Sequence, residues 1–480
     1  MHVGGNRIVF IEFNELCPDL LARWMADGTL PNFRRFHDAS QVFTGAADVT
    51  DPRFLEPWIQ WYSLHTGLSY EQHEVFHLTD GPTAGHTDVW HALLDGGIPV
   101  GNCASMNAPA FAAPGSFYLP DPWCMTERPF PAELAAYQKI IVSKVQENSN
   151  AGAAVSRADY IDFAKFLVRN GLRTGTVMAI VEQLVAEISN RGVGWKRAAL
   201  LDKLQLDIFL KLWKRNRPAF ASFFLNSTAH FQHAYFHLLE PGKFDLPQDD
   251  LDDPVHQHAI LFGYKEMDRI LGDFFALERE GVTLVLSTAL SQQPNEGAGK
   301  RYYRPRNIDG LLAGLDLHPT RTLPVMAHQY SALFATQADA DAAHAALAAV
   351  SMDGQPVFGF DEAPERTLFF NCQIGSNVAQ TAQVQLRPGS NTTAPFYELF
   401  YKIPHMKTGI HHPDSVLWFK TGVHAVHEGR TSILNIFPTM LDYFDVPMAP
   451  QDGIARQGHS ILDETGMARF RAPQRVPVDA

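Results

Sequence analysis

Cysteine is scarce in this chain. Only four cysteines occur among 480 residues, at Cys17, Cys103, Cys124 and Cys372, and no two of them form a Cys-x-x-Cys pair. This spacing excludes a zinc ribbon and a dense disulfide framework, so we expect reduced thiols. No uninterrupted apolar run is long enough to cross a bilayer, and residues 1–7 lack the apolar core of a signal peptide. We therefore expect a cytoplasmic protein without a membrane partner.

Positive charge is also in short supply. Lysine and arginine total 39 against 52 aspartates and glutamates, which gives a formal net charge of −13. Because the chain has no basic stripe, the acidic balance argues against nucleic acid as a partner. The composition, with 46% hydrophobic and 19% charged residues, is that of an ordinary folded globule. We expect a small-molecule substrate or ligand, and assembly into a homo-oligomer stays open.

Short apolar runs alternate with helical patterns along the chain. Residues 7–13 read RIVFIEF, a run typical of a buried strand, and Pro18 lies near the first turn of the helix that should follow. Segments of the same two kinds come later, with a helix expected over 87–96 and strands over 98–102, 219–225, 282–286 and 415–419. This order predicts an α/β fold, a mostly parallel central sheet flanked by helices.

Two stretches interrupt the alternation. Residues 130–215 contain consecutive helical patterns, which predict a helical insertion or cap. Residues 300–387 mix proline, glycine, an alanine-rich helix and short strands, which predicts a second insertion near the edge of the sheet. The whole chain, 1–480, is therefore expected to form a single α/β domain that carries both insertions.

Motifs spread over the whole chain carry a family resemblance. They lie in residues 17–21, 30–33, 56–58, 63–68, 72–76, 117–122, 226–233, 408–412 and 432–441. Each is a weak signal alone, but their order and spacing resemble the type I phosphodiesterase/nucleotide pyrophosphatase branch of the alkaline phosphatase superfamily. The resemblance implies an alkaline-phosphatase-like sheet with a metal-assisted phosphoryl or sulfuryl transfer site at the carboxyl ends of its strands.

The first of the two metal sites that this resemblance implies is not matched. Asn14 stands where the family has a metal-binding Asp after the first strand, and Thr288-Ala289 stands where it has an Asp-His pair. Leu55 or Pro57, depending on the alignment, replaces the nucleophilic Thr or Ser. Two dications about 4 Å apart repel strongly unless anionic ligands surround them. The substitutions therefore predict at most one metal.

The second implied site is partly matched. His233 and His411 stand where the family has metal-binding histidines, whereas Ala229 replaces the expected Asp. His230 lies three residues before His233, so on a helix both could reach one ion. His230, His233 and His411 would then hold one zinc, manganese or iron ion. The alternative is that these histidines are hydrogen-bonded remnants of an active-site cleft.

Polar groups at the floor of the expected cleft are candidate catalytic residues. Asn14 and Glu15 follow the first strand, and Glu56 and His65 belong to the segment that normally presents the nucleophile. Glu56 could act as general acid, general base or nucleophile, and Glu15 could handle the proton instead. Two structural alternatives stay open: Glu56 caps the helix beginning at Pro57, and Asn14 is only a hydrogen-bonding remnant.

Three functions fit these residues. The first is a divergent alkaline-phosphatase-superfamily enzyme that hydrolyses, or transfers a group from, a phospho-, sulfo- or glycosyl-type small substrate with at most one metal. The second is a catalytically inactive pseudoenzyme that binds a ligand or partner protein in the former active-site cleft. The third is a conventional two-metal phosphodiesterase, which is disfavoured because spare carboxylates are missing near 226–233 and 287–293. We favour the enzyme with altered chemistry.

Overall fold

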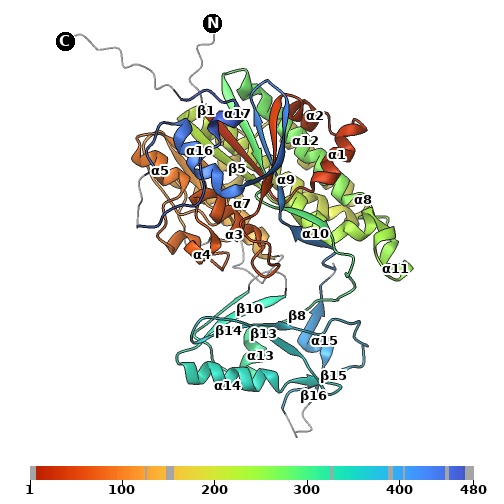
Figure 1. Cartoon of the computed structure of the whole chain (residues 1–480). Helices are drawn as coiled ribbons and strands as arrows, with labels where there is room; N and C mark the ends of the chain where they lie inside the picture. The colour runs from red at the N-terminus through yellow and green to blue at the C-terminus, as the bar shows by residue number, and fades with distance from the viewer. Residues whose placement is uncertain are drawn as a thin grey trace, which may run out of the picture.

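An eight-stranded sheet runs through the main part of the chain in the order β20-β2-β19-β6-β1-β5-β3-β4 (Figure 1). In this computed structural model, which describes residues 7–124, 127–147, 156–324, 328–387, 393–403, 406–448 and 453–470, β19 alone in the sheet runs antiparallel to its neighbours. The strands are β1 (Arg7–Phe13), β2 (Ser40–Ala46), β3 (Val100–Cys103), β4 (Phe117–Leu119), β5 (Phe220–Leu225), β6 (Val282–Ser287), β19 (Asp414–Lys420) and β20 (Ala425–Ser432). The predicted mostly parallel α/β fold is confirmed.

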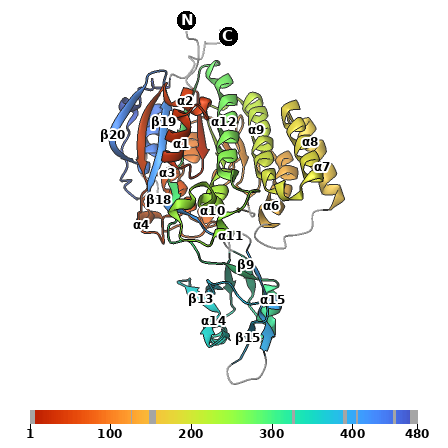
Figure 2. The same ribbon diagram turned by 90° about the vertical axis from the view of Figure 1, so that its right-hand side faces the viewer.

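Helices cover both faces of this sheet (Figure 2). One face carries α1 (Pro18–Ala26), α2 (Pro31–His37), α9 (Arg197–Asn216), α10 (Ser227–Leu239) and α12 (Ala259–Glu278), and the other α3 (Pro57–Thr66), α5 (Val89–Asp95) and α16 (Ile436–Tyr443). Strand β1 is buried on both faces. Val9 and Ile11 pack on the face that carries α1 and α12, and Ile8 and Phe10 pack on the face that carries α3 and α16. A strand buried on both faces needs the continuous apolar run that its sequence shows.

Further helices lie around this core. They are α4 (Tyr70–His73), α6 (Ala135–Glu147), α7 (Arg157–Arg169), α8 (Thr174–Ser189), α11 (Gln248–Leu251) and α17 (Leu462–Thr465). Figure 2 shows α7 and α8 at the outer edge of the main part, at the end opposite β20. Among the helices that the structure describes, none is both long and apolar enough to cross a membrane.

A smaller unit lies below the main part in Figure 1. It has its own cluster of buried hydrophobic residues, which runs from Tyr303 to Phe400. It contains β8 (Tyr303–Pro305), β9 (Arg321–Pro324), β10 (Gln329–Leu333), β11 (Ser351–Met352), β12 (Gln355–Pro356), β13 (Phe358–Asp361), β14 (Thr367–Cys372), β15 (Gln383–Gln385), β16 (Thr393–Pro395), β17 (Phe400–Lys402), α13 (Ile308–Gly314), α14 (Gln337–Ala348) and α15 (Phe396–Leu399). The division of the chain into insertions at 130–215 and 300–387 stays a prediction.

A short antiparallel ribbon, β7 (Ser291–Pro294) with β18 (Gly409–His412), adjoins the main sheet. β7 comes soon after the carboxyl end of β6, and β18 directly precedes β19. In the register of this ribbon, His411 lies opposite Gln292. The carboxyl ends of β1 and β5 lie at the same edge of the sheet, because these two strands pair in parallel. Residues that follow β1, β5 and β6 therefore meet beside the ribbon.

Candidate metal centre

Glu15 lies at the centre of the polar groups that meet there. It follows β1 with a φ of 60°, in the left-handed region, which costs an L-residue about 1–2 kcal/mol. This turn places a carboxylate that is 2% exposed among hydrogen-bond donors. Asn14 Nδ2 donates to Oε1 at 2.6 Å, and Gln292 Nε2 donates to Oε2. The main-chain oxygen of Glu15 accepts a bond from Gln232 Nε2 at 2.7 Å.

His233 reaches the same carboxylate from α10. Its Nε2 lies 3.0 Å from Glu15 Oε2, and its Nδ1 lies 3.0 Å from the main-chain oxygen of Gly409. A carbonyl oxygen only accepts hydrogen bonds, so Nδ1 carries a proton and donates it. In a neutral His233 the lone pair is then on Nε2, the nitrogen that faces Glu15.

His411 approaches from β18. Its Nε2 lies 3.3 Å from Glu15 Oε2, and its Nδ1 lies 3.4 Å from Glu56 Oε2. The ring is only 9% exposed. Among the residues that the structure describes, no group completes a hydrogen bond of good geometry with His411 Nε2. A buried ring nitrogen without a hydrogen bond costs folding free energy. His411 Nε2 points at Glu15 Oε2, the atom that His233 Nε2 also approaches.

The protonation of Glu15 and the protonation of the nearby histidines depend on one another. Burial alone would raise the pKa of Glu15, but the charges of His411 and His233 hold it well below its ordinary value. Burial alone would lower the pKa of His411, but Glu15, and then Glu56, raise it. The cluster therefore favours a positive charge, carried by protons or by a cation, next to the Glu15 carboxylate.

The donor set fits one divalent cation. One ligand atom each from Glu15, His233 and His411 lies within 4.8 Å of the others. Ligand atoms that share a cation at about 2.1 Å are roughly 3.0–3.4 Å apart, and the two distances from Glu15 Oε2 are 3.0 and 3.3 Å. Two imidazoles and one carboxylate suit zinc, iron or manganese. Both histidines also have their other nitrogen facing a carbonyl or carboxylate, the arrangement that orients metal ligands.

The other predicted site residues lie in different places. His230 is exposed and is not part of this group, although it shares α10 with His233. His65 lies in the last turn of α3, where it is buried and its Nε2 is 2.8 Å from Glu12 Oε1. Asn14 lies beside Glu15 and also donates to Asn226 Oδ1 at 2.7 Å. The structure thus gathers Asn14, Glu15, Glu56, His233 and His411, and leaves His230 and His65 outside.

Glu56 occupies the N-cap position of α3, but its side chain makes no cap hydrogen bond. Glu56 therefore has the position that the helix-cap interpretation predicts, but it does not cap α3 through a side-chain hydrogen bond. Its carboxylate instead faces His411 Nδ1, and it is 24% exposed, more than the carboxylate of Glu15. A carboxylate in this position would fix the orientation and the tautomer of the ring it faces.

Gln292 was missed at the sequence level. It joins the site through Glu15 Oε2 and also donates to the main-chain oxygen of Ala229 at 3.0 Å. The available signal was weak: a polar Ser-Gln-Gln run shortly after the apolar residues of β6. A four-residue ribbon strand has too little apolar alternation to be predicted.

No protein nucleophile takes part in this group as the structure describes it. Leu55 is buried at 3% exposure, and Pro57 begins α3. A serine and a histidine do meet elsewhere, where Ser63 Oγ lies 2.9 Å from His73 Nε2. His73 Nδ1 accepts a hydrogen bond from Val75 N, so Nε2 carries the proton. This histidine donates to the serine and cannot activate it as a base.

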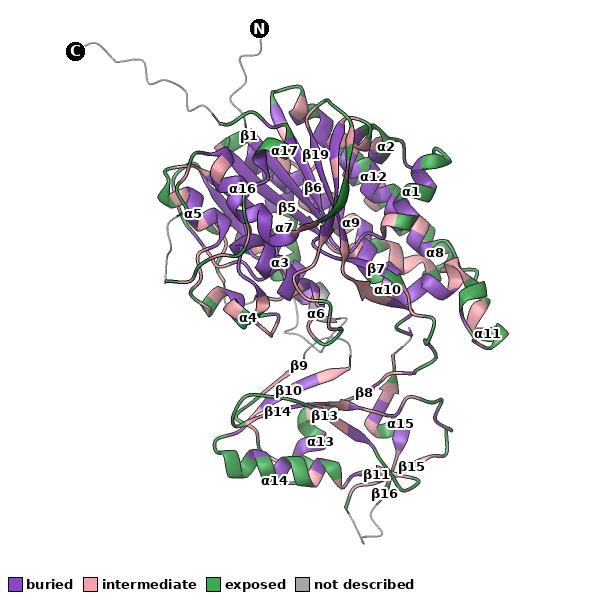
Figure 3. Cartoon of the chain, viewed as in Figure 1, coloured by how far each residue is buried: buried purple, intermediate pink, exposed green. Residues whose placement is uncertain are grey.

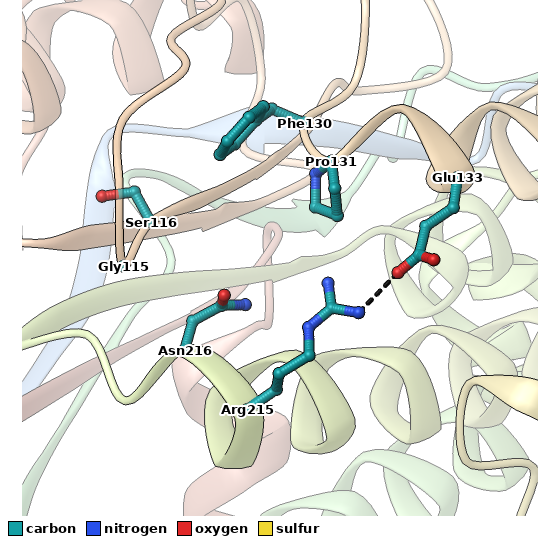
Figure 4. A pocket seen from close by; sticks show the side chains of 7 residues that line it. All are labelled: Gly115, Ser116, Phe130, Pro131, Glu133, Arg215 and Asn216. Atoms are coloured by element: carbon teal, nitrogen blue, oxygen red, sulfur yellow. Dashed lines mark hydrogen bonds and ion pairs between the residues drawn. The ribbon is translucent and has the colours of Figure 1, made fainter.

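A cavity of about 380 Å³ lies elsewhere (Figure 4). Four of its lining residues directly precede strands, Gly115 and Ser116 before β4 and Arg215 and Asn216 before β5, so the cavity is at the amino ends of these strands, away from Glu15. The ion pair of Glu133 and Arg215 crosses one side of it. It holds none of the residues of the candidate centre, which lies at the carboxyl edge of the sheet.

The fold and these residues together define an α/β protein with a candidate mononuclear centre of one carboxylate and two imidazoles. No protein-family model and no curated protein matches the chain. Among solved structures, phosphonoacetate hydrolase of Sinorhizobium meliloti with phosphonoformate is 12% identical, over 90% of this chain and 94% of its own, with a TM-score of 0.41.

Two other solved structures show a similar level of likeness. Human ectonucleotide pyrophosphatase/phosphodiesterase 5 is 10% identical, covers 96% of this chain and 100% of its own, and has a TM-score of 0.45. Alkaline phosphatase PafA is 12% identical, with 96% and 99% coverage and a TM-score of 0.46. Likenesses this weak leave the activity of the present chain to be argued from its own residues.

Proposed function

We propose that Glu15, His233 and His411 bind a single divalent metal ion, and that the protein is a divergent hydrolase of the alkaline phosphatase superfamily. The superfamily is proposed from the order of the sequence motifs. The observation that carries the metal is the pair of histidines: each has Nδ1 facing a carbonyl or carboxylate oxygen, and each directs Nε2 at the same oxygen of Glu15. Such a cation would supply Lewis acidity, which polarises a substrate oxygen and acidifies water.

The chain's own residues would prepare the centre. Asn14 and Gln292 hold the Glu15 carboxylate by donating to its two oxygens, which keeps it ionised and fixed. Glu56 would orient His411, and the Gly409 carbonyl orients His233. Because Leu55 and Pro57 offer no nucleophilic oxygen, we propose direct attack by water on a small phospho- or sulfo-ester, without a covalent intermediate on the protein.

The alternative is a pseudoenzyme that binds a ligand or partner protein without turnover. It is favoured by one observation: Leu55 is an apolar residue and Pro57 begins α3, so neither provides a nucleophilic side chain beside the centre. The two functions differ in turnover and agree in metal binding. Glycosyl substrates are a weaker case. Of the three aromatic residues of α3 that could stack on a sugar, Trp61 and Tyr62 are buried in the core at 0% and 2% exposure, and Trp58 is half-buried with its Nε1 donating to the main-chain oxygen of Phe76.

Metal content and turnover test the proposal together. We expect about one zinc, manganese or iron ion per chain in purified protein, lost in His233→Ala and in His411→Ala. His424→Ala is the matched control, because His424 is exposed and its contacts, of Nδ1 with the main-chain oxygen of His37 and of its ring with the His37 ring, involve no residue of the centre. Aryl phosphate mono- and diesters and aryl sulfates should be hydrolysed by the loaded protein. Metal without turnover would favour the pseudoenzyme, and the absence of metal would overturn the centre.

A further inference from the structure

Helix α8 has its apolar side chains on the outside. Its buried residues are Thr176 and Gln183, and Gln183 Nε2 donates to the main-chain oxygen of Val193 and to Glu187. The outward surface instead carries large apolar side chains that are between 41% and 86% exposed, namely Val177, Met178, Val181, Leu184, Val185 and Ile188. Figure 3 colours many residues of α8 as exposed, whereas the strands of the main sheet are coloured as buried. We call these six residues the α8 stripe.

The spacing of the stripe is that of a helix-packing seam. Val177, Val181, Leu184 and Ile188 follow one another at intervals of four, three and four residues. This is the alternation of apolar positions that lets one helix pack along another. Met178 and Val185 widen the seam on one side. An apolar seam with this repeat fits the same seam on a second helix.

The few charged residues of α8 indicate that the surface that covers the α8 stripe is uncharged. Helix α8 contains no lysine or arginine, and its two acidic residues are Glu182 and Glu187. Glu187 is already paired with Arg197 of its own chain. A helix that lies in a membrane interface normally carries basic residues on its polar side, and the chain as a whole is acidic, at −13. These observations favour a protein seam over an anionic lipid surface.

The area of the stripe is sufficient for self-association. The exposed fractions correspond to roughly 550 Å² of apolar surface, near the top of the range of about 300–600 Å² for the largest patch on a monomer. Two stripes in full contact would bury at most about 1,100 Å², close to the roughly 1,000 Å² expected of a biological interface, and flanking residues would add to it. A two-fold axis brings identical surfaces together, so a self-complementary seam needs no second kind of partner.

We propose that the chain forms a two-fold symmetric dimer in which the α8 stripe of one copy packs against the α8 stripe of the other. The candidate metal centre takes no part in this contact. Analytical ultracentrifugation at micromolar concentration should find a dimer for the full chain and a monomer for the double variant Val181→Glu/Leu184→Glu. Both side chains are more than half exposed, so the variant should keep its circular dichroism and melting temperature.

Val426→Glu is the matched control, since Val426 is 64% exposed on β20, at the opposite end of the main part. It should remain dimeric. A second measurement locates the axis: of single cysteines introduced at 177, 181, 184 and 188, those nearest the two-fold axis should cross-link between copies. All four native cysteines are buried, so they should add little background. A monomeric wild type would overturn the proposal, as would a dimer that survives the double variant. Monomeric protein that binds neutral phosphatidylcholine vesicles through Val181 and Leu184 would also overturn it, in favour of a lipid surface.

Discussion

Removal of the Glu56 carboxylate should weaken metal binding without unfolding the protein. Glu56 Oε2 lies 3.4 Å from His411 Nδ1. Two unit charges at this distance interact by about 5 kcal/mol at an effective dielectric constant near 20 and by about 1 kcal/mol in bulk water. Because Glu56 is 24% exposed, the lower part of that range applies, about 1.4–2.7 kcal/mol, which is a 10- to 100-fold loss of affinity.

The assay is competition with a chromophoric chelator, which yields the metal Kd of wild type, Glu56→Ala and Glu56→Gln. The glutamine variant should lie between the other two, because its amide oxygen still accepts from Nδ1 but carries no charge. Glu71→Gln is the matched control, an exposed carboxylate on α4, and should bind metal as the wild type does. Equal Kd values for Glu56→Ala and wild type would refute the role of Glu56 in orienting His411.

The remaining predictions concern stability. Burial lowers the pKa of His73 from 6.5 to about 3, so its stabilising contribution is complete above pH 6.5 and is lost on acidification. In urea unfolding, the wild type should therefore lose about 2 kcal/mol more than His73→Gln between pH 7 and pH 5, and equal losses would contradict this. Asn14→Asp replaces an amide that donates to Glu15; calorimetry should show a loss of about 2 kcal/mol in chelator, partly recovered with zinc, and an unchanged melting temperature would contradict this. Gly67 has a φ of 66° and a Cβ there would meet Phe437 at 3.0 Å, so Gly67→Ala should cost about 1–2 kcal/mol in urea unfolding.

The sequence predicts the sheet well because its central strands are buried on both faces. The apolar runs near residues 7–13, 219–225 and 282–286 strongly favour buried strands. In the structure they form β1, β5 and β6. Parallel pairing of β1 with β5 then brings Glu15 and the start of α10 to one edge. That part of the candidate site follows from the chain order of the strands.

The side chains that complete the site depend on finer geometry. Residues three apart on a helix differ by about 60° around its axis, which is enough to leave His230 exposed while His233 faces Glu15. The short strand that carries Gln292 has too few apolar residues for a periodic signal. Periodicity also misleads in α8, since an apolar stripe is normally taken to face the core of its own chain, and there it faces outward.

The ribbon of β7 and β18 has a mechanical consequence. The chain leaves the main part through β7, builds the smaller unit and returns through β18. Gln292, which holds Glu15, is on the outgoing strand, and His411 is on the returning one. Any force on the smaller unit therefore reaches the main sheet along the two strands that fix the Glu15 carboxylate and the His411 ring. The candidate centre lies at the connection between the main part and the smaller unit, so the distances between its ligand atoms depend on the position of the smaller unit.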